Sequence, residues 1–408
     1  MIVRRSAAVL AATAVIGTAF APSALADDSS PSSPSRALPS GLYGSTDPTY
    51  DGVWRQSLAL LAQHTAGVRP AAKAVDWLAG QQCANGAFAP YRADATAKCD
   101  ARTMVDTNST AAAVQALEAL GGHDSVTGAA VKWLKSVQNK DGGWGYTAGG
   151  ASDTNSTAVV IGALGAAGTD PEAVPSKGAK TPYDALLGLS IGCGKKGSGA
   201  FAFQPGKKGG LAANADATAA GVLGALGKGF VTKAGTSSGD FTCAGGDTFD
   251  SADAAHNGAS YLAESLKDTP YLKSALAGAD DQPDYGNTAD AVVALAAAGS
   301  TSAAKQPLAW LEKNSGAWAA KSGPAAYAQL IFAAHATGTD PRDFGGTDLV
   351  ERLGATGPAA DAPASPGAEQ KDDDGDSGPG VWWIVGVGLV AGIGVGFLIS
   401  GRNRKRQL

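Results

Sequence analysis

Apolar residues recur at helical spacing in short segments of this chain, and glycine-rich turns separate one segment from the next. In residues 130–138, valine, tryptophan and leucine return every three or four positions, as on one face of a helix. Residues 139–146 interrupt that helix with glycines, and residues 153–156 are types that favour a helix start. A second helix, rich in small residues, is expected at 158–164. The pattern predicts two helices joined by a tight turn.

This arrangement returns along the chain as an internal repeat. Residues 106–111 and 153–158 both read Asp-Thr-Asn-Ser-Thr-Ala, and each copy opens a run rich in alanine. Weaker or partial copies can be traced at 53–61, 185–219, 284–295 and 310–334. Because a repeat of about 50 residues cannot bury its apolar face alone, the units must pack side by side. The sequence therefore predicts an all-α fold.

Both ends of the chain carry signals typical of export and membrane anchoring. Residues 1–26 combine two arginines, an apolar run and a small-residue cleavage site, which indicates a signal peptide. Ordinary secretion is expected, although the arginine pair leaves twin-arginine export open. Residues 381–400 are an uncharged run of about 20 residues, long enough to cross a bilayer, and a basic tail follows at 401–408. We expect one C-terminal transmembrane helix with the rest of the mature chain outside the cell.

A large domain at 41–358 is predicted between two linkers that lack periodic apolar residues, at 27–40 and 359–380. Without the leader arginines and the basic tail, the formal net charge falls from −5 to about −11, which argues against nucleic acid as a partner. The acidic stretch at 371–376 lacks the carboxylate that would close a calcium loop. A solvated spacer is therefore expected there.

Four cysteines in an exported chain predict two disulfides. Three pairings are possible. We favour Cys83 with Cys99 and Cys193 with Cys243, because each pair closes a local loop. No histidine lies near them in the sequence, so they are not expected to bind a metal.

One turn of the repeat carries a motif with a known counterpart. Gln138 is followed by Asp-Gly-Gly-Trp-Gly at 141–145 and by Ser-Thr-Ala at 156–158. This run resembles the Gln-Trp repeat of the prenyltransferase and squalene cyclase superfamily, and weaker likeness extends over residues 43–353. The resemblance implies an α/α toroid, in which inner helices surround a central cavity and outer helices enclose them. It implies less about function, because the same toroid serves cyclases, protein prenyltransferases, thioester domains and cobalamin carriers similar to intrinsic factor and transcobalamin.

The residues that the enzymes of this superfamily use are incomplete here. Class II terpene cyclases protonate their substrate with an Asp-x-Asp-Asp acid, and the only comparable cluster lies in the spacer. Protein prenyltransferases need zinc held by Asp, Cys and His. Asp250, Asp253 and His256 share one predicted helical face, but a capping aspartate at a helix start is the favoured interpretation. The sequence therefore supports no catalytic residue and no metal ligand.

Two further chemistries are excluded on similar grounds. Thioester domains require Cys-Gly-Glu-Gln, whereas Cys193 and Gly194 are followed by two lysines. The four histidines sit in unrelated local contexts, and none accompanies a nucleophilic serine elbow.

Polar residues at the helix starts are the remaining candidates for a binding site. In a toroid the N-termini of the inner helices gather at one rim, where amide, hydroxyl and carboxylate groups suit a ligand rich in amides or hydroxyls. The candidate ligand-binding residues are Asp106, Asn108, Trp144, Asp153, Asn155, Asn214, Asp216 and Asp284. The alternative is that the polar residues are only helix caps and that Trp144 is only a packing wedge between repeats.

By elimination, the sequence favours a membrane-anchored extracellular receptor or carrier that supplies a transporter. The resemblance to intrinsic factor-like proteins makes cobalamin the first ligand expected. Those carriers close a small β-rich domain over cobalamin, so here a separate chain would have to supply the lid. One alternative is an enzyme, either of the cyclase or prenyltransferase type or a polysaccharide lyase, which would need an acid such as Asp216 or Asp253. The other is a cell-envelope interaction protein without a small ligand.

Overall fold

The computed structural model describes residues 38–236, 242–245, 249–274 and 281–360, which belong to a single compact unit. This part of the chain is mostly α-helical with one short two-stranded sheet, which confirms the all-α prediction. The α-helices are α1 (Gly52–Thr65), α2 (Ala72–Gly80), α3 (Thr107–Leu120), α4 (Asp124–Ser136), α5 (Thr154–Ala166), α6 (Pro182–Leu189), α7 (Ala215–Ala225), α8 (Ser251–Ser265), α9 (Tyr285–Ala297), α10 (Thr301–Asn314), α11 (Gly316–Ser322), α12 (Pro324–Thr337) and α13 (Leu349–Gly354). A 3₁₀ turn, η1 (Pro171–Ala173), precedes α6, and the antiparallel strands are β1 (Leu272–Lys273) and β2 (Pro283–Asp284).

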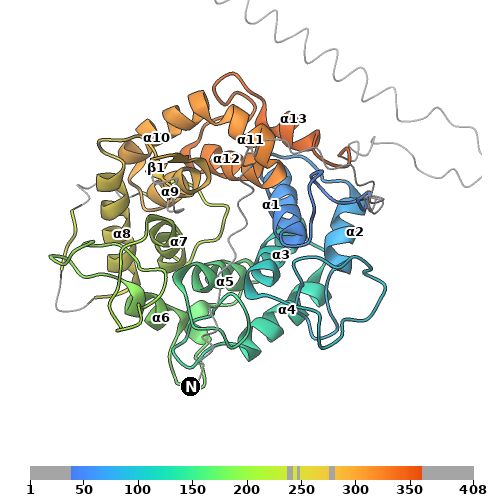
Figure 1. The fold of residues 1–408 in the computed structure, drawn as a ribbon, viewed down its shortest axis with the longest axis horizontal. Helices are drawn as coiled ribbons and strands as arrows, with labels where there is room; N and C mark the ends of the chain where they lie inside the picture. Colours follow the sequence, from blue (N-terminus) through green and yellow to red (C-terminus); the bar gives the residue numbers. More distant parts are fainter. Residues whose placement is uncertain (1–37, 237–241, 246–248, 275–280, 361–408) are drawn as a thin grey trace, which may run out of the picture. The chain divides into compact units, whose positions relative to one another are not determined.

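Six of the described helices form a closed inner ring (Figure 1). Each of α1, α3, α5, α7, α9 and α12 packs against the next, and α12 packs against α1 to complete the circle. Outside this ring lie α2, α4, α6, α8, α10 and α13, each packed against the inner helices beside it. The described unit is therefore toroid-like, with alternating inner and outer helices.

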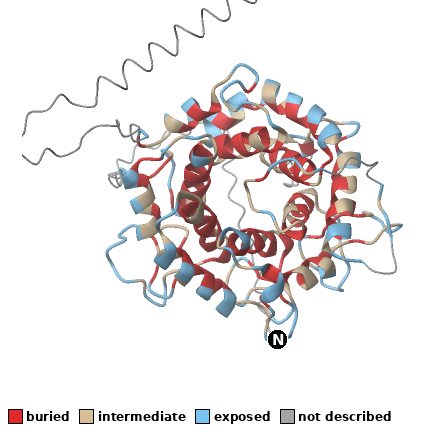
Figure 2. Ribbon diagram, turned by 180° about the vertical axis from the view of Figure 1, so that it is seen from behind, coloured by how far each residue is buried: buried red, intermediate tan, exposed pale blue. Residues whose placement is uncertain are grey.

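The two layers differ in composition as their surroundings require. Inner helix α5 is built from small and apolar residues on all sides, and it is buried from Ser156 to Leu164. Outer helix α4 buries one face through Trp133 and Leu134 while its lysines remain exposed. Figure 2 shows the consequence, a ring of buried inner helices within an outer layer whose far side is exposed. A helix that is apolar all round must be enclosed, whereas an amphipathic helix covers it.

Inner helices α3, α5, α7 and α9 begin in the same way. A capping side chain accepts a hydrogen bond from the backbone N–H three residues later, which satisfies one of the free donors at the helix start. The capping residues are Asp106, Asp153, Asn214 and Asp284, at 2.6, 2.7, 2.8 and 3.0 Å from the nitrogens that they accept from. The repeated polar segments read from the sequence are thus helix N-termini.

A buried threonine in each of these helices fastens the preceding turn. Its hydroxyl accepts a hydrogen bond from the backbone N–H of the residue that the turn inserts into the core. The pairs are Thr110 with Phe88, Thr157 with Trp144, Thr218 with Phe201 and Thr288 with Leu272, at 2.9 to 3.1 Å. Because this threonine lies in the first turn of the helix and also holds the preceding turn, the motif recurs as a unit.

In the turns before α3 and α5, a glutamine and a glycine join neighbouring repeats. The side-chain amide of Gln138 donates to the carbonyl of Val174 in the next repeat, as that of Gln82 donates to Val126, at 3.1 and 2.7 Å. At Gly142 the backbone has φ +93°, and a Cβ there would stand 2.0 Å from the carbonyl oxygen of Thr181. Only glycine permits both this conformation and this close approach.

The ring is closed by the two ends of the described unit. The opening helix that the sequence placed at 53–61 is α1, and its outer partner is α13, almost 300 residues later in the chain. The backbone N–H of Gly44 donates to the carbonyl of Thr356 at 2.8 Å, and the Tyr43 hydroxyl donates to that of Pro358 at 3.0 Å. The incomplete first repeat is thereby completed from the C-terminal side.

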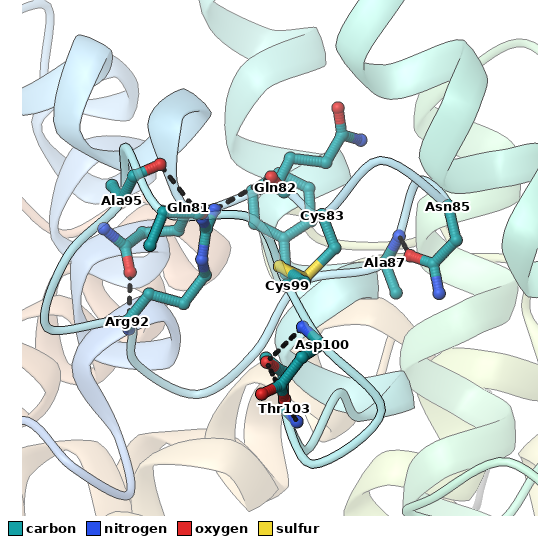
Figure 3. Close-up of a disulfide and its surroundings, with 12 residues drawn as sticks. Gln81, Gln82, Cys83, Asn85, Ala87, Arg92, Ala95, Cys99, Asp100 and Thr103 are labelled. Atoms are coloured by element: carbon teal, nitrogen blue, oxygen red, sulfur yellow. Dashed lines mark hydrogen bonds between the residues drawn. A yellow bond between two sulfur atoms is a disulfide. The ribbon is translucent and has the colours of Figure 1, made fainter.

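Both predicted disulfides are confirmed. Cys83 is bonded to Cys99, and Cys193 is bonded to Cys243. The first bond anchors the inserted loop of the first repeat, in which the Arg92 guanidinium donates to carbonyl groups on both sides (Figure 3). Within the described residues, no helix is both long enough and apolar enough to cross a membrane. The predicted signal peptide, the acidic spacer and the transmembrane helix at 381–400 lie outside the described residues.

Candidate binding site

A cavity of about 220 Å³ lies at the centre of the inner ring. Every inner helix contributes to its wall, and the segment that follows α7 contributes Lys228, Gly229 and Phe230. The residues from the helices are Trp54, Leu58, Asn108, Gln115, Asn155, Ala158, Val159, Asp216, Ala219, Ala220, Leu223, Asp290, Gln329 and Phe332. A concave site with a mostly apolar wall and a few convergent polar groups is the usual form of a small-molecule site.

The depth of the cavity follows from helix geometry. Asn108 and Asp216 are the second residues of α3 and α7, and Gln115 and Leu223 are the ninth residues of the same helices. Seven residues of α-helix rise about 10 Å. The cavity therefore extends from the N-terminal rim of the ring to about 10 Å below it, where polar residues have given way largely to apolar ones.

Polar groups occupy one arc of the cavity, formed by α3, α5, α7 and α9. The side-chain amide of Asn155 donates to the Asp216 carboxylate at 2.8 Å, which links α5 to α7. The amide of Gln329 donates to the Asp290 carboxylate at 3.0 Å, which links α12 to α9. Three of the four candidate acceptors in this arc, Asn108, Asn155 and Asp216, were predicted from the sequence.

The carboxyl groups of this arc have pKa values raised above the usual value for aspartate. Burial and the negative charge of Asp216 raise the pKa of Asp290 to about 8, against the effect of the Gln329 hydrogen bond. Burial also raises the pKa of Asp216, an effect that the Asn155 hydrogen bond opposes and the charge of Asp284 reinforces. No ion pair among the described residues involves any of these three carboxylates. Acidic groups are thus gathered at the cavity without an ion-pair partner among the described residues.

Two side-chain amides of the same arc have oxygens without a hydrogen-bond partner among the described residues. Oδ1 of Asn108 and Oδ1 of Asn155 are buried, and neither accepts a hydrogen bond within the described part of the chain. A buried acceptor without a donor costs about 1–3 kcal/mol. Such a cost is retained in many binding sites, where a ligand supplies the missing donor.

Aromatic side chains occupy the opposite side of the cavity. The ring of Phe230 meets Trp54 edge to face at 5.5 Å and lies nearly parallel to Phe332 at 6.3 Å. The Phe230 segment is held by Gln115, whose side-chain oxygen accepts from the Phe230 N–H at 3.0 Å and whose amide donates to Val159 at 3.1 Å. One glutamine of α3 therefore fixes the segment that closes the inner end of the cavity.

The remaining predicted binding residues have structural roles. Asp106, Asp153 and Asn214 cap their helices, and none of them lines the cavity. Asp284 caps α9 while its charge acts on Asp216 and Asp290. The Trp144 side chain is buried, with 1% of its surface exposed, and its indole N–H donates to the Leu134 carbonyl at 2.8 Å. It is a packing wedge, the alternative considered from the sequence.

The cavity residues that the sequence did not single out include four that make the hydrogen bonds described above, Asp290, Gln115, Gln329 and Phe230. Asp290 stands alone in the alanine-rich run of α9, and an isolated carboxylate in such a run was the available signal. Gln115 and Gln329 lie in similar runs within α3 and α12. Phe230 carried no signal, because only the folded ring brings its loop against α3.

The predicted start of α8 has the capping role favoured from the sequence. Asp250 and Asp253 form a reciprocal capping box, and His256 Nε2 lies 3.1 Å from the Thr242 carbonyl oxygen. Over the described ranges of the chain, no cluster of three or more His, Cys, Asp or Glu side chains could hold a metal ion.

No protein-family model matches this chain, and no curated protein matches it. Among solved structures, it is similar to a sugar epimerase from a ruminal bacterium, with 16% sequence identity over 67% of this chain and 80% of the epimerase. The TM-score is 0.41, and a likeness at that level supports no inference about activity.

Proposed function

We propose that this protein is an extracellular receptor or carrier that binds a small molecule in the axial cavity. The observation that supports the proposal best is the convergence of Asn108, Asn155, Asp216 and Asp290 from four successive inner helices on one cavity. Helix packing alone does not require polar side chains at these positions, since the neighbouring lining residues are alanine, valine and leucine. Burying polar groups costs free energy that a bound ligand offsets.

The setting of this site outside the cell is part of the proposal. It is supported by the two disulfides, which are typical of oxidising compartments, and by the sequence signals for export and for a span at 381–400. Membership of the prenyltransferase and squalene cyclase superfamily is also proposed, on the motif at Gln138 and residues 141–145.

The volume of the cavity limits the size of the ligand that it can enclose. Sites for drug-sized molecules have volumes of about 300–1,000 Å³, so a cavity of about 220 Å³ fits a compact molecule. Cobalamin, which we expected from the resemblance, is much larger and would have to rest on the rim beneath a lid from another chain. It stays in the set of compounds to be tested.

The test is thermal melting and calorimetric titration of the purified full-length protein with cobalamin and with a library of small amines, amides and sugars. A true ligand raises the melting temperature and binds saturably. The Ala220→Trp variant, which fills the cavity, should abolish that response, whereas Ala320→Trp on the exposed side of α11 should leave it unchanged. A response that survives Ala220→Trp, or no response to any compound, would exclude the cavity as the binding site.

A second candidate function is acid catalysis in the same cavity. Asp290 has a pKa of about 8, so it can donate a proton at neutral pH, and Asp216 lies close enough to influence it. For this alternative, the Asp290→Asn variant should bind a substrate with little change and lose turnover by at least about a hundredfold. Product analysis by mass spectrometry after incubation with bound library compounds distinguishes the two functions.

A further inference from the structure

Among the described residues, the carboxyl groups at the cavity form no ion pair. Asp216, Asp284 and Asp290 influence one another electrostatically, so their charges are within range of mutual repulsion. The groups that reach the cavity carboxylates are neutral amides, from Asn155 and Gln329. Lys228 lines the inner end of the cavity but forms no ion pair with a described carboxylate.

The acceptors of the arc outnumber the donors that are bound to them, so a ligand that donates hydrogen bonds would fit there. A carboxylate accepts up to about four hydrogen bonds, and one side-chain donor is bound to each of Asp216 and Asp290. The amide oxygens of Asn108 and Asn155 accept none within the described chain. The arc therefore offers several acceptors that the described chain leaves free, which suits a ligand that carries N–H groups.

The aromatic wall on the opposite side of the cavity suits the apolar part of a ligand that carries N–H groups at its other end. Trp54, Phe230 and Phe332 form a continuous aromatic surface, and Leu58 and Leu223 extend it. The face of an aromatic ring attracts a cation as well as an apolar body. A ligand that spans the cavity can place a charged head on the acidic arc and an apolar part on this wall.

We infer that the ligand is an organic cation, a primary ammonium compound with a compact apolar body. This inference rests on the proposed function and specifies the substrate class of that site. The ammonium group donates three hydrogen bonds to the arc of Asn108, Asn155, Asp216 and Asp290, and the apolar body lies against Trp54, Phe230 and Phe332. An inorganic cation fits less well, because two carboxylates that also accept amide hydrogen bonds do not form a metal cage and an aromatic wall offers no metal ligands.

The experiment compares three probes of nearly the same shape by calorimetry with the purified full-length protein. They are 2-phenylethylamine, 2-phenylethanol and phenylacetate, which end in a cation, a neutral donor and an anion. Two more amines, 3-methylbutylamine and agmatine, are included because the phenyl group of the first probe could be the wrong shape for the cavity even if the site binds an ammonium group. At least one amine should bind saturably, and it should bind at least tenfold more tightly than its neutral analogue, with no binding of the anion.

Matched variants test which residues hold the charged head. Asp216→Asn and Asp290→Asn keep the shape of the side chains and should each weaken amine binding at least tenfold. Asp124→Asn, at an exposed position on α4, should not change it. Amine affinity should also rise between pH 6 and pH 8, because ionisation of Asp290, beside Asp216 and Asp284, adds negative charge while an alkylammonium stays protonated.

The other possible outcomes show whether the cationic ligand alone is wrong or the receptor function is wrong as well. Equal binding of 2-phenylethanol, preferential binding of phenylacetate, a response to Ca²⁺ or Mg²⁺ alone, or no binding of any amine would overturn the inference. If neutral library compounds bind wild type and fail to bind Ala220→Trp, the proposed receptor function stands and only the cationic ligand is wrong. If no compound separates wild type from Ala220→Trp, the receptor function fails as well.

Discussion

Asp290 is a carboxyl group with acidic neighbours that forms no ion pair within the described chain. Burial and the charges of Asp216 and Asp284 raise its pKa from 3.8 to about 8. The folded state therefore binds the proton of this group more tightly than the unfolded chain does, and folding stability falls as the pH rises from about 4 to about 8. Asp290 therefore lowers the stability of the fold at neutral pH. Residues with such a cost are commonly found at functional sites, where their chemistry is needed.

The pH dependence of stability tests whether the pKa of Asp290 is raised in the folded state. Asp290→Asn replaces the carboxyl group with a neutral group of the same shape. The variant should melt at a higher temperature than wild type at pH 8 to 9, and the difference should shrink as the pH falls toward 4. Thermal melts across this range provide the measurement, with Asp124→Asn as the control for an exposed carboxylate. A variant that is less stable than wild type at pH 9 would show that the ionised group is stabilised by a partner.

At the scale of the element, the repeated Asp-Thr-Asn-Ser-Thr-Ala segment divides its residues between stability and the site. The first aspartate caps the helix and the later threonine holds the preceding turn, while the asparagine at the second helical position faces the cavity. These roles follow from helix geometry, since residues two positions apart in the first turn point in different directions.

Removal of a cap should affect stability and not ligand binding. Asp106→Ala and Asp153→Ala each remove an acceptor for the helix start, which should lower the free energy of unfolding by about 1–2 kcal/mol. Urea denaturation measures this change, and Asp124→Ala, outside the cap position of α4, should cost much less. Ligand affinity below the unfolding transition should remain that of wild type. A cap variant that folds stably but loses binding would place the aspartate in the site.

The close approach between repeats can be tested with two glycines of similar conformation. Gly142 and Gly149 have φ of +93° and +78°, but a Cβ at Gly142 would strike the Thr181 carbonyl whereas one at Gly149 would meet open space. Gly149→Ala should cost about 1–2 kcal/mol for its backbone strain alone. Gly142→Ala should cost at least about 2 kcal/mol more, because two repeats must move apart. Equal losses in chemical denaturation would mean that the contact is unimportant.

At the scale of the whole described unit, closure distinguishes this ring from an open stack of repeats. In an open solenoid each repeat contacts only its neighbours and the terminal repeats fray. Here α13 packs on both α12 and α1, so the first and last repeats support each other. Closure also gives the axial cavity its complete wall, because Trp54 of α1 and Phe332 of α12 line the same cavity only when the circle is complete.

Loss of packing at the closure should therefore destabilise both ends together. Leu353 of α13 is fully buried, and Leu353→Ala should lower the free energy of unfolding by about 2–5 kcal/mol. Hydrogen exchange followed by mass spectrometry should show faster exchange in α1 and α12 to a similar extent. Faster exchange confined to α13 would indicate that it is only an appendage to the ring.

Local features of the fold could be predicted from the sequence, but only some residues of the candidate site could. Asn108, Asn155 and Asp216 were predicted because they belong to the repeated polar segment, and both disulfides were predicted because each closes a local loop. Asp290, Gln329 and Phe230 were missed because nothing in their neighbourhood repeats. Their importance depends on partners about 40 to 115 residues away.

The sequence alone determined the helical repeat and the polar segments that begin its inner helices, because these depend on residues close together in the chain, and it favoured the cysteine pairing that the structure shows. Only the tertiary structure decided which polar residues cap a helix and which face a ligand, since both kinds occupy the same segment and differ only in direction. It also decided that the circle closes between α1 and α12 and that the loop after α7 closes the inner end of the cavity. Contacts between distant segments carry no periodic signal, so they emerge only when the helices are packed together.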